Sequence, residues 1–274
     1  MLLASAICSC SEKQPETTEP MITKTEIQVE NGQFTPEIMH RLGKVGDVQV
    51  SPDHSKILYG VTYTSIEQNK GNRELYLMNV DGSGNVKITN TPKSESNARW
   101  LNDSQIIYMR SGKLYTATIE GATLKNETEV AGAEGMESFE LSPAGDKLMF
   151  IKSVKAAQKP TDVYADLDKS SGRTYEDLMY RHWDHFVEEV PHTYVASFNG
   201  TQLSGVTDIL AGDTANPETD TKKFELPTLP FGGLEQLAWT PDGKYIAYSC
   251  RKLAGRDYAF STNTDIYLYN VETG

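Results

Sequence analysis

Residues 175–189, YEDLMYRHWDHFVEE, hold more ionisable side chains than the sequence around them: carboxylates, two histidines and an arginine. A carboxylate shielded from bulk water binds an ammonium group strongly and with a preferred direction. Histidines also bind metal ions, and the histidines available here are His182, His185 and the nearby His192. The three-residue spacing of the first two matches no recognised closed site, so we predict no metal and no other cofactor.

The same stretch is predicted to form a helix that interrupts a strand-rich protein. Thr174 followed three residues later by Asp177 resembles a capping box, and Pro191 ends the element. One apolar face would pack on the rest of the protein through Tyr175, Met179, Trp183 and Phe186. The opposite face would carry the charged residues Asp177, Arg181, Asp184 and Glu188.

Two interpretations of this charged face remain open. In the first, it is exposed to solvent and paired within the helix, with Arg181 contacting both Asp177 and Asp184. In the second, some of its carboxylates lie over a central opening of the protein and bind a cationic group.

The elements that would position this stretch recur along the chain. Four segments share a turn followed by an alternating strand, at residues 50–59, 100–108, 141–150 and 239–248. The turns begin at equivalent positions that are 50, 41 and 98 residues apart, namely Ser51, Leu101, Ser142 and Thr240. In the Ser-Pro-Asp-Gly form of the turn, Pro presets φ, Asp bonds the local backbone and Gly accepts a positive φ. The longest gap between turns contains the ionisable stretch.

A second strand follows three of these turns, at residues 74–81, 113–119 and 265–272, and residues 86–89 add a further short strand. Units of about 40–50 residues with several short antiparallel strands are typical of β-propeller blades. A β-sandwich with coincidental turns is the alternative. We therefore predict an all-β fold of propeller blades with one inserted helix, in which four recognisable blades form part of a larger, incomplete ring.

The N-terminus predicts export and lipid attachment. Residues 1–10, MLLASAICSC, resemble the end of a signal peptide, and Ile7 and Ser9 before Cys10 resemble a bacterial lipobox in which Cys10 would carry the lipid. The alternative is an ordinary apolar N-terminus. Residues 11–35 would tether the propeller domain, residues 36–274, to the membrane of the cell envelope, in the periplasm or at the outer membrane. The net charge of −12 disfavours nucleic acid as a partner.

The repeat, the lipobox-like start and the motif LMYRHWD at residues 178–184 together resemble one family. It is the N-terminal propeller of bacterial prolyl-oligopeptidase-family serine peptidases, in the branch of dipeptidyl and acylaminoacyl peptidases. The resemblance covers most of residues 36–274 and implies that an α/β-hydrolase domain with a Ser, Asp and His triad follows the propeller. No G-x-S-x-G motif occurs in this sequence, so no catalytic residue is assigned in it.

The resemblance also implies a role for the insertion at about residues 152–190. In dipeptidyl peptidases an acidic element of the propeller holds the free amino terminus of the substrate. The corresponding candidates for substrate binding here are Arg181, Asp184, Glu188 and Glu189.

We expect the chain to gate a secreted serine exopeptidase that releases dipeptides or acylated residues from short peptides. It would be inert without its own hydrolase domain, and a homodimer is compatible with this reading. One alternative is a non-catalytic envelope propeller that binds a protein or glycan partner. Another is a propeller glycosidase, which needs paired carboxylates at a fixed separation.

Overall fold

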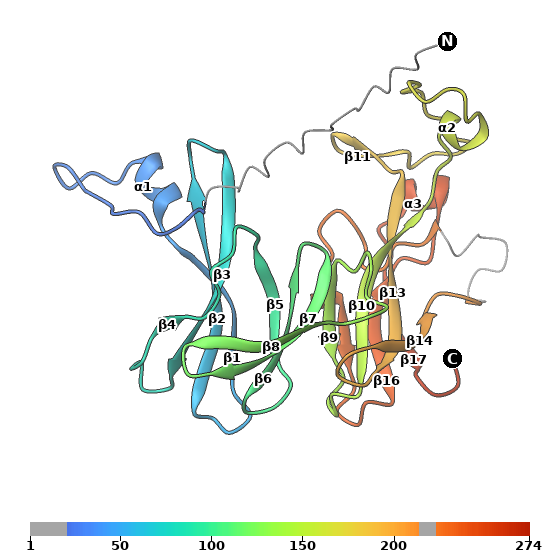
Figure 1. Cartoon of the computed structure of the whole chain (residues 1–274). Helices are drawn as coiled ribbons and strands as arrows, with labels where there is room; N and C mark the ends of the chain where they lie inside the picture. Colours follow the sequence, from blue (N-terminus) through green and yellow to red (C-terminus); the bar gives the residue numbers. More distant parts are fainter. Residues whose placement is uncertain (1–20, 214–222) are drawn as a thin grey trace, which may run out of the picture.

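The computed structural model describes residues 21–213 and 223–274, which form an arc of four antiparallel sheets that follow one another along the chain (Figure 1). The predicted signal peptide, the predicted lipidation site Cys10 and residues 11–20 of the predicted tether lie outside the described residues. Within the described part of the chain, no helix has both the length and the apolar character needed to cross a bilayer.

Each sheet is one propeller blade. Blade 1 contains β1 (Lys44–Val50), β2 (Lys56–Ser65), β3 (Lys70–Asn79) and β4 (Val86–Lys87). Blade 2 contains β5 (Glu95–Trp100), β6 (Gln105–Arg110), β7 (Lys113–Glu120) and β8 (Thr123–Glu129). Blade 3 contains β9 (Ser138–Leu141), β10 (Lys147–Lys155), β13 (Glu189–Phe198) and β14 (Leu203–Asp208). Blade 4 contains β15 (Leu237–Trp239), β16 (Tyr245–Cys250) and β17 (Asp265–Asn270).

The remaining elements are short and lie outside the blades. They are α1 (Pro36–Arg41), α2 (Pro160–Val163), the 3-10 turn η2 (Leu234–Gln236), α3 (Gly255–Phe260) and a hairpin made of β11 (Arg181–His182) and β12 (His185–Phe186). The hairpin and α2 belong to the insertion between β10 and β13, and α3 joins β16 to β17.

The predicted turn joins the first two strands of every blade. In blade 3 the hydroxyl of Ser142 accepts a hydrogen bond from the backbone N–H of Lys147 (3.0 Å). Ser51 and Thr240 accept the equivalent bonds from Lys56 (2.9 Å) and Tyr245 (3.0 Å). A hydroxyl at the equivalent position therefore closes the turn in three blades, because Ser and Thr hydroxyls readily bond nearby backbone groups.

Each blade also carries one stacked aromatic pair between its second and third strands. The ring centroids are 5.4–6.0 Å apart in the pairs Tyr59–Tyr76, Tyr108–Tyr115, Phe150–Tyr194 and Tyr248–Tyr267. All four pairs are direct cross-strand neighbours, where aromatic side chains stabilise a sheet.

The hydrophobic core is divided into three clusters, and each lies between two consecutive blades. One joins blades 1 and 2 around Leu58 and Tyr108, one joins blades 2 and 3 around Phe139, and one joins blades 3 and 4 around Met149. This serial packing confirms the propeller and excludes the sandwich, in which two sheets would share one core. At the two ends of the arc, apolar residues of β1 and β17 are exposed, among them Val45 at 63% and Ile266 at 81%.

The predicted helix over residues 175–189 is wrong. Residues 181–186 form the hairpin β11–β12 instead, and the only helix of the insertion, within its described residues, is the four-residue α2. Met179 and Trp183 have positive φ angles of 63° and 48°, which a right-handed helix cannot contain. The predicted apolar stripe is wrong as well, since the Trp183 side chain is 71% exposed.

Candidate functional site

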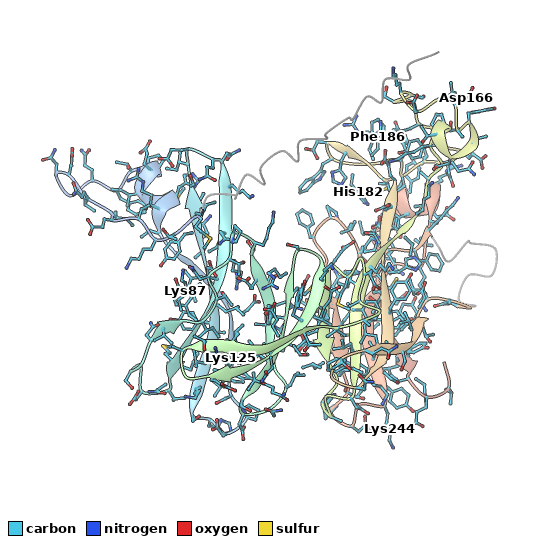
Figure 2. The ribbon with its side chains drawn as sticks, viewed as in Figure 1. Lys87, Lys125, Asp166, His182, Phe186 and Lys244 are labelled. Carbon is cyan, nitrogen blue, oxygen red and sulfur yellow. The ribbon has the colours of Figure 1, made fainter. Side chains whose placement is uncertain are left out.

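The insertion rises from one face of the propeller. β10 and β13 remain paired from Lys147–Ser197 up to Lys155–Glu189, and the chain between them carries α2 and the hairpin β11–β12. Figure 1 shows this extended pair rising above blade 3, with α2 at its outer side and β11 reaching back toward the middle of the arc. In Figure 2, Asp166 marks the outer end of the insertion and Phe186 its inner side.

A buried carboxylate fastens the hairpin to the next blade. Glu225 is 2% exposed, and its Oε1 lies 2.6 Å from Nε2 of His182 on β11, which is also buried. The other oxygen, Oε2, accepts hydrogen bonds from the hydroxyl of Tyr258 on α3 and from the backbone N–H of Leu229 (3.1 Å). The guanidinium of Arg251 lies 4.1 Å above the Tyr258 ring. One carboxylate therefore joins three segments that are far apart in the sequence.

Sequence reasoning missed Glu225. The available signal is a single carboxylate inside the apolar run FELP, where a charged residue has to find partners if the segment is buried. The identity of those partners follows only from the tertiary structure, since His182 is 43 residues away.

Two exposed aromatic rings meet at the tip of the hairpin, one from the hairpin and one from the segment that follows Glu225. Trp183 packs edge-on against Phe231, with ring centroids 5.1 Å apart, and Phe231 is 79% exposed. Trp183 has a positive φ, which is unusual for a bulky residue but is the geometry of the favoured two-residue hairpin turns, and Trp183 is the first residue of such a turn. Because Glu225 bonds both His182 and Leu229, it fixes the two segments from which these rings project.

The four candidate substrate residues are not gathered into one cluster. Asp184 has a side chain that is 94% exposed and lies 3.1 Å from Nδ1 of its neighbour His185. Arg181 lies with its guanidinium 5.1 Å from the centre of the Phe186 ring, and the expected pairing of Arg181 with Asp177 and Asp184 is not formed.

The two neighbouring glutamates differ in their surroundings. Glu188 is bound by Lys159 Nζ (2.5 Å) and Arg173 Nε (2.5 Å), and hydrogen bonds from these two cations lower the pKa of its carboxyl group. Glu189 is exposed and forms no ion pair with any residue in the described ranges. Both border a cavity of about 300 Å³ whose other walls include His182, Phe186 and Leu229. Glu189 is thus the carboxylate of this cavity that is free to bind an external cation.

The three histidines do not converge on one point. His182 contacts Glu225, His185 contacts Asp184, and His192 Nδ1 lies 2.7 Å from Asp208 Oδ2 inside blade 3. In the described part of the chain no cluster of three or more His, Cys, Asp or Glu side chains is arranged to hold a metal ion.

A close contact also joins the insertion to α3. Oδ1 of Asp177 accepts the backbone N–H of Arg256 (3.1 Å), and a Cβ atom on Gly255 would lie 1.8 Å from Oδ2 of the same carboxylate. Gly255 has a φ of +54°, so its conformation favours glycine, and a side chain there would also displace the Asp177 carboxylate from its bond to Arg256.

We therefore expect Gly255→Ala to lower the free energy of unfolding by about 1–3 kcal/mol, measured by thermal denaturation. Gly205→Ala is the matched control, because Gly205 has a similar φ of +63° but open space where the Cβ would go. An equal loss of unfolding free energy in the two variants would show that the Asp177 contact does not contribute to stability.

Comparison with known proteins shows which proteins this chain resembles in sequence and in fold. No family model matches the chain. Dipeptidyl-peptidase 5 of Porphyromonas gingivalis is 35% identical over 244 residues, which are 88% of this chain and 34% of that protein. Dipeptidyl-peptidase 5 of Porphyromonas endodontalis is 34% identical over 255 residues, which are 91% of this chain and 35% of that protein. The chain thus spans about a third of the length of these relatives.

A solved structure supports the fold independently. Acylaminoacyl peptidase of Pyrococcus horikoshii matches 84% of this chain and 31% of its own, with a TM-score of 0.54 and 16% identity. At that identity the match concerns the fold alone. This chain is thus a β-propeller segment that is similar in sequence to the dipeptidyl-peptidase 5 proteins of two Porphyromonas species and similar in fold to part of an acylaminoacyl peptidase.

Proposed function

We propose that this chain is the substrate-gating propeller of a secreted serine exopeptidase that releases dipeptides from the free amino ends of short peptides. The observation that carries the proposal is the 35% identity to a dipeptidyl-peptidase across 88% of the chain. The chemistry would be acyl transfer to a serine of the hydrolase domain, so no residue described here takes part in bond cleavage. The propeller alone would be inert.

The insertion is the part of the propeller that suits a role in substrate binding. It rises from one face beside α3, and its inner hairpin is locked in place by the buried Glu225. In the cavity bordered by Glu188 and Glu189, the Glu188 carboxylate is neutralised by Lys159 and Arg173, whereas the Glu189 carboxylate has no ion pair among the described residues. An unpaired carboxylate beside a peptide-sized opening is suited to bind the ammonium of a peptide N-terminus.

In the protein that includes the hydrolase domain, Glu189→Gln should raise KM for dipeptidyl chromogenic substrates about tenfold and leave kcat nearly unchanged. The reason is that it removes an ion pair formed equally in the ground and transition states. Glu120→Gln, an exposed change at the end of β7 in blade 2, is the control. Unchanged KM would assign Glu189 to the solvent-exposed surface, and a change in kcat alone would point to docking of the hydrolase domain.

We further propose that the chain is held in the bacterial envelope through a lipid on Cys10. Labelled fatty acid should be incorporated into the protein when it is expressed in a bacterial host, and Cys10→Ser should abolish the label. Cys8→Ser is the matched control and should retain it, because Cys8 does not occupy the lipobox position. Label retained in Cys10→Ser would contradict the proposal.

A further inference from the structure

The turn between β13 and β14 contains Asn199 and Gly200, one of the two Asn-Gly pairs in the sequence; the other is Asn31–Gly32. An asparagine side chain can be attacked by the backbone nitrogen of the next residue, and glycine hinders this attack least because it has no side chain. Asn199 is exposed to solvent, and the space where Gly200 would carry a Cβ is open. The turn is therefore accessible to a modification that needs water but no enzyme.

Three donors converge on the side-chain oxygen of Asn199. Oδ1 accepts hydrogen bonds from the backbone N–H groups of Thr201 (3.0 Å) and Gln202 (2.9 Å) and from the hydroxyl of Thr201 (3.3 Å). When a nucleophile attacks Cγ of an amide, negative charge develops on this oxygen, and fixed donors aimed at such an oxygen lower the barrier of the attack. The turn thus holds Asn199 in an arrangement that resembles an oxyanion hole.

Asn31 differs from Asn199 in its backbone conformation. Its φ is +51°, and the turn around it is closed by a bond from the N–H of Gln33 to the carbonyl of Glu30 (3.1 Å). In the left-handed region ψ is near +45°, which turns the following backbone nitrogen to the side opposite the asparagine side chain. Asn199 has a negative φ and is free of this obstacle. The two pairs therefore allow a comparison within one chain.

We propose that Asn199 is a site of spontaneous deamidation and isoaspartate formation. Hydroxide removes the backbone proton of Gly200, the nitrogen attacks Cγ of Asn199, and the new N–Cγ bond closes a five-membered imide. The Cγ–Nδ2 bond breaks, and ammonia leaves with a proton from water, which restores the hydroxide. A second water opens the imide at either carbonyl, giving aspartate or isoaspartate. This site does not depend on the proposed peptidase function.

The modification would act on the contact between blades 2 and 3. The carbonyl of Gly200 accepts the hydroxyl of Thr116 on β7 (3.3 Å), and the carbonyl of Thr201 accepts the N–H of Ala131 (3.0 Å). Buried residues of the core cluster between these blades flank the turn, namely Val130, Phe198 and Leu203. Isoaspartate adds one methylene to the main chain and would displace residues 200–203 from these partners. Aspartate keeps the main chain and the acceptor oxygen, so it should preserve the contact.

The test is incubation of the 274-residue chain at pH 8 and 37 °C, followed by mass spectrometry of its peptides. The amide of Asn199 should be lost about tenfold faster than that of Asn31, because donors are fixed around the former. A synthetic peptide with the sequence of residues 197–203 is the unfolded reference and should react several-fold more slowly than Asn199 in the folded chain, since its donors are not held in place. Enzymatic methylation of isoaspartate should label the same tryptic peptide.

Two variants separate the chemistry from its consequence. Thr201→Val removes one of the three donors and should slow the loss of the Asn199 amide about three- to tenfold. Thr123→Val, an exposed change at the start of β8, is the matched control and should leave the rate unchanged. Asn199→Asp supplies the negative charge without the extra methylene, so it should melt as the fresh chain does, whereas the incubated chain should melt at a lower temperature.

The proposal is overturned if Asn31 reacts as fast as Asn199, if the free peptide reacts faster than the folded chain, or if Thr201→Val leaves the rate unchanged. An incubated chain that contains isoaspartate at residue 199 but melts as the fresh chain does would refute the effect on the contact between blades 2 and 3.

Discussion

Replacing Glu225 with Ala is expected to lower the free energy of unfolding by about 3–5 kcal/mol, which is the range for removing one partner from a buried, hydrogen-bonded charge network. The change leaves His182 and Tyr258 buried without their shared acceptor. Because these two residues come from β11 and α3, local stability should fall most where the insertion meets blade 4.

The measurement is thermal unfolding combined with hydrogen exchange of residues 181–187. The variant should melt at a lower temperature, and the amides of the β11–β12 hairpin should exchange much faster than those of blades 1 and 2. Glu225→Gln keeps one acceptor and should lose about half as much stability. Glu272→Ala, at an exposed position, is the control and should leave stability nearly unchanged. A Glu225→Ala variant with unchanged exchange would show that the carboxylate does not hold the hairpin.

Glu95→Gln is expected to stabilise the protein above neutral pH. Glu95 is completely buried, and its Oε2 has no partner among the described residues. Arg110 lies 3.8 Å away, but its guanidinium is bound to Glu127 at 2.6 Å. Burial is the main reason that the pKa of Glu95 rises from 4.5 to about 7, and the nearby carboxylate of Glu74 raises it further.

The direction of the pH effect follows from this raised pKa. Between pH 4.5 and about 7 the folded chain keeps a proton on Glu95 that the unfolded chain has lost. The contribution of this group to stability is therefore complete below pH 4.5 and is lost as the pH rises through about 7. Gln cannot lose a proton, so the variant should gain on the order of 1–2 kcal/mol relative to the original chain at pH 8 and much less at pH 5.

Urea unfolding of both proteins between pH 5 and pH 8 measures this difference. Glu134→Gln, an exposed position in the segment before β9, is the control and should show the same stability difference at every pH. A Glu95→Gln advantage that is equal at pH 5 and pH 8 would mean that Glu95 is already ionised in the folded protein at the lower pH.

The blades were predictable from the sequence because their determinants are local. The hydroxyl of Ser51, Ser142 or Thr240 bonds a backbone N–H only five residues away, so the turn is visible in a short window. In the strand that follows each turn, successive side chains point alternately to the two neighbouring blades, so apolar residues recur with a period of two. Ile106 and Tyr108 face blade 1, for example, whereas Ile107 and Met109 face blade 3.

The insertion was not predictable in the same way. Its apolar and charged residues have helical spacing and a cap-like start, yet its conformation is set by contacts with distant segments. His182 is drawn into the interior by Glu225, and Asp177 is bound to Arg256 79 residues later. Local periodicity contains no information about such partners, so tertiary contacts override it.

The sequence therefore predicted an insertion at this place in the chain but not its conformation, and the role of its residues in substrate binding stays a prediction. The insertion does stand at one face of the propeller, and Glu188 and Glu189 border one cavity. The sequence could not reveal that Lys159 and Arg173 neutralise Glu188, since both cations come from other parts of the insertion. Nor could it place Arg181 and Asp184, which project from a hairpin rather than from a helix.

The central claim is that this propeller controls access to chemistry performed by a hydrolase domain. The most direct test compares the purified 274-residue chain with a longer protein in which the proposed hydrolase domain follows it, using dipeptidyl chromogenic substrates with free and blocked amino termini. We expect the 274-residue chain to release no chromophore, and the longer protein to cleave the substrates with free amino termini. Turnover by the 274-residue chain alone, or none by the longer protein, would contradict the account.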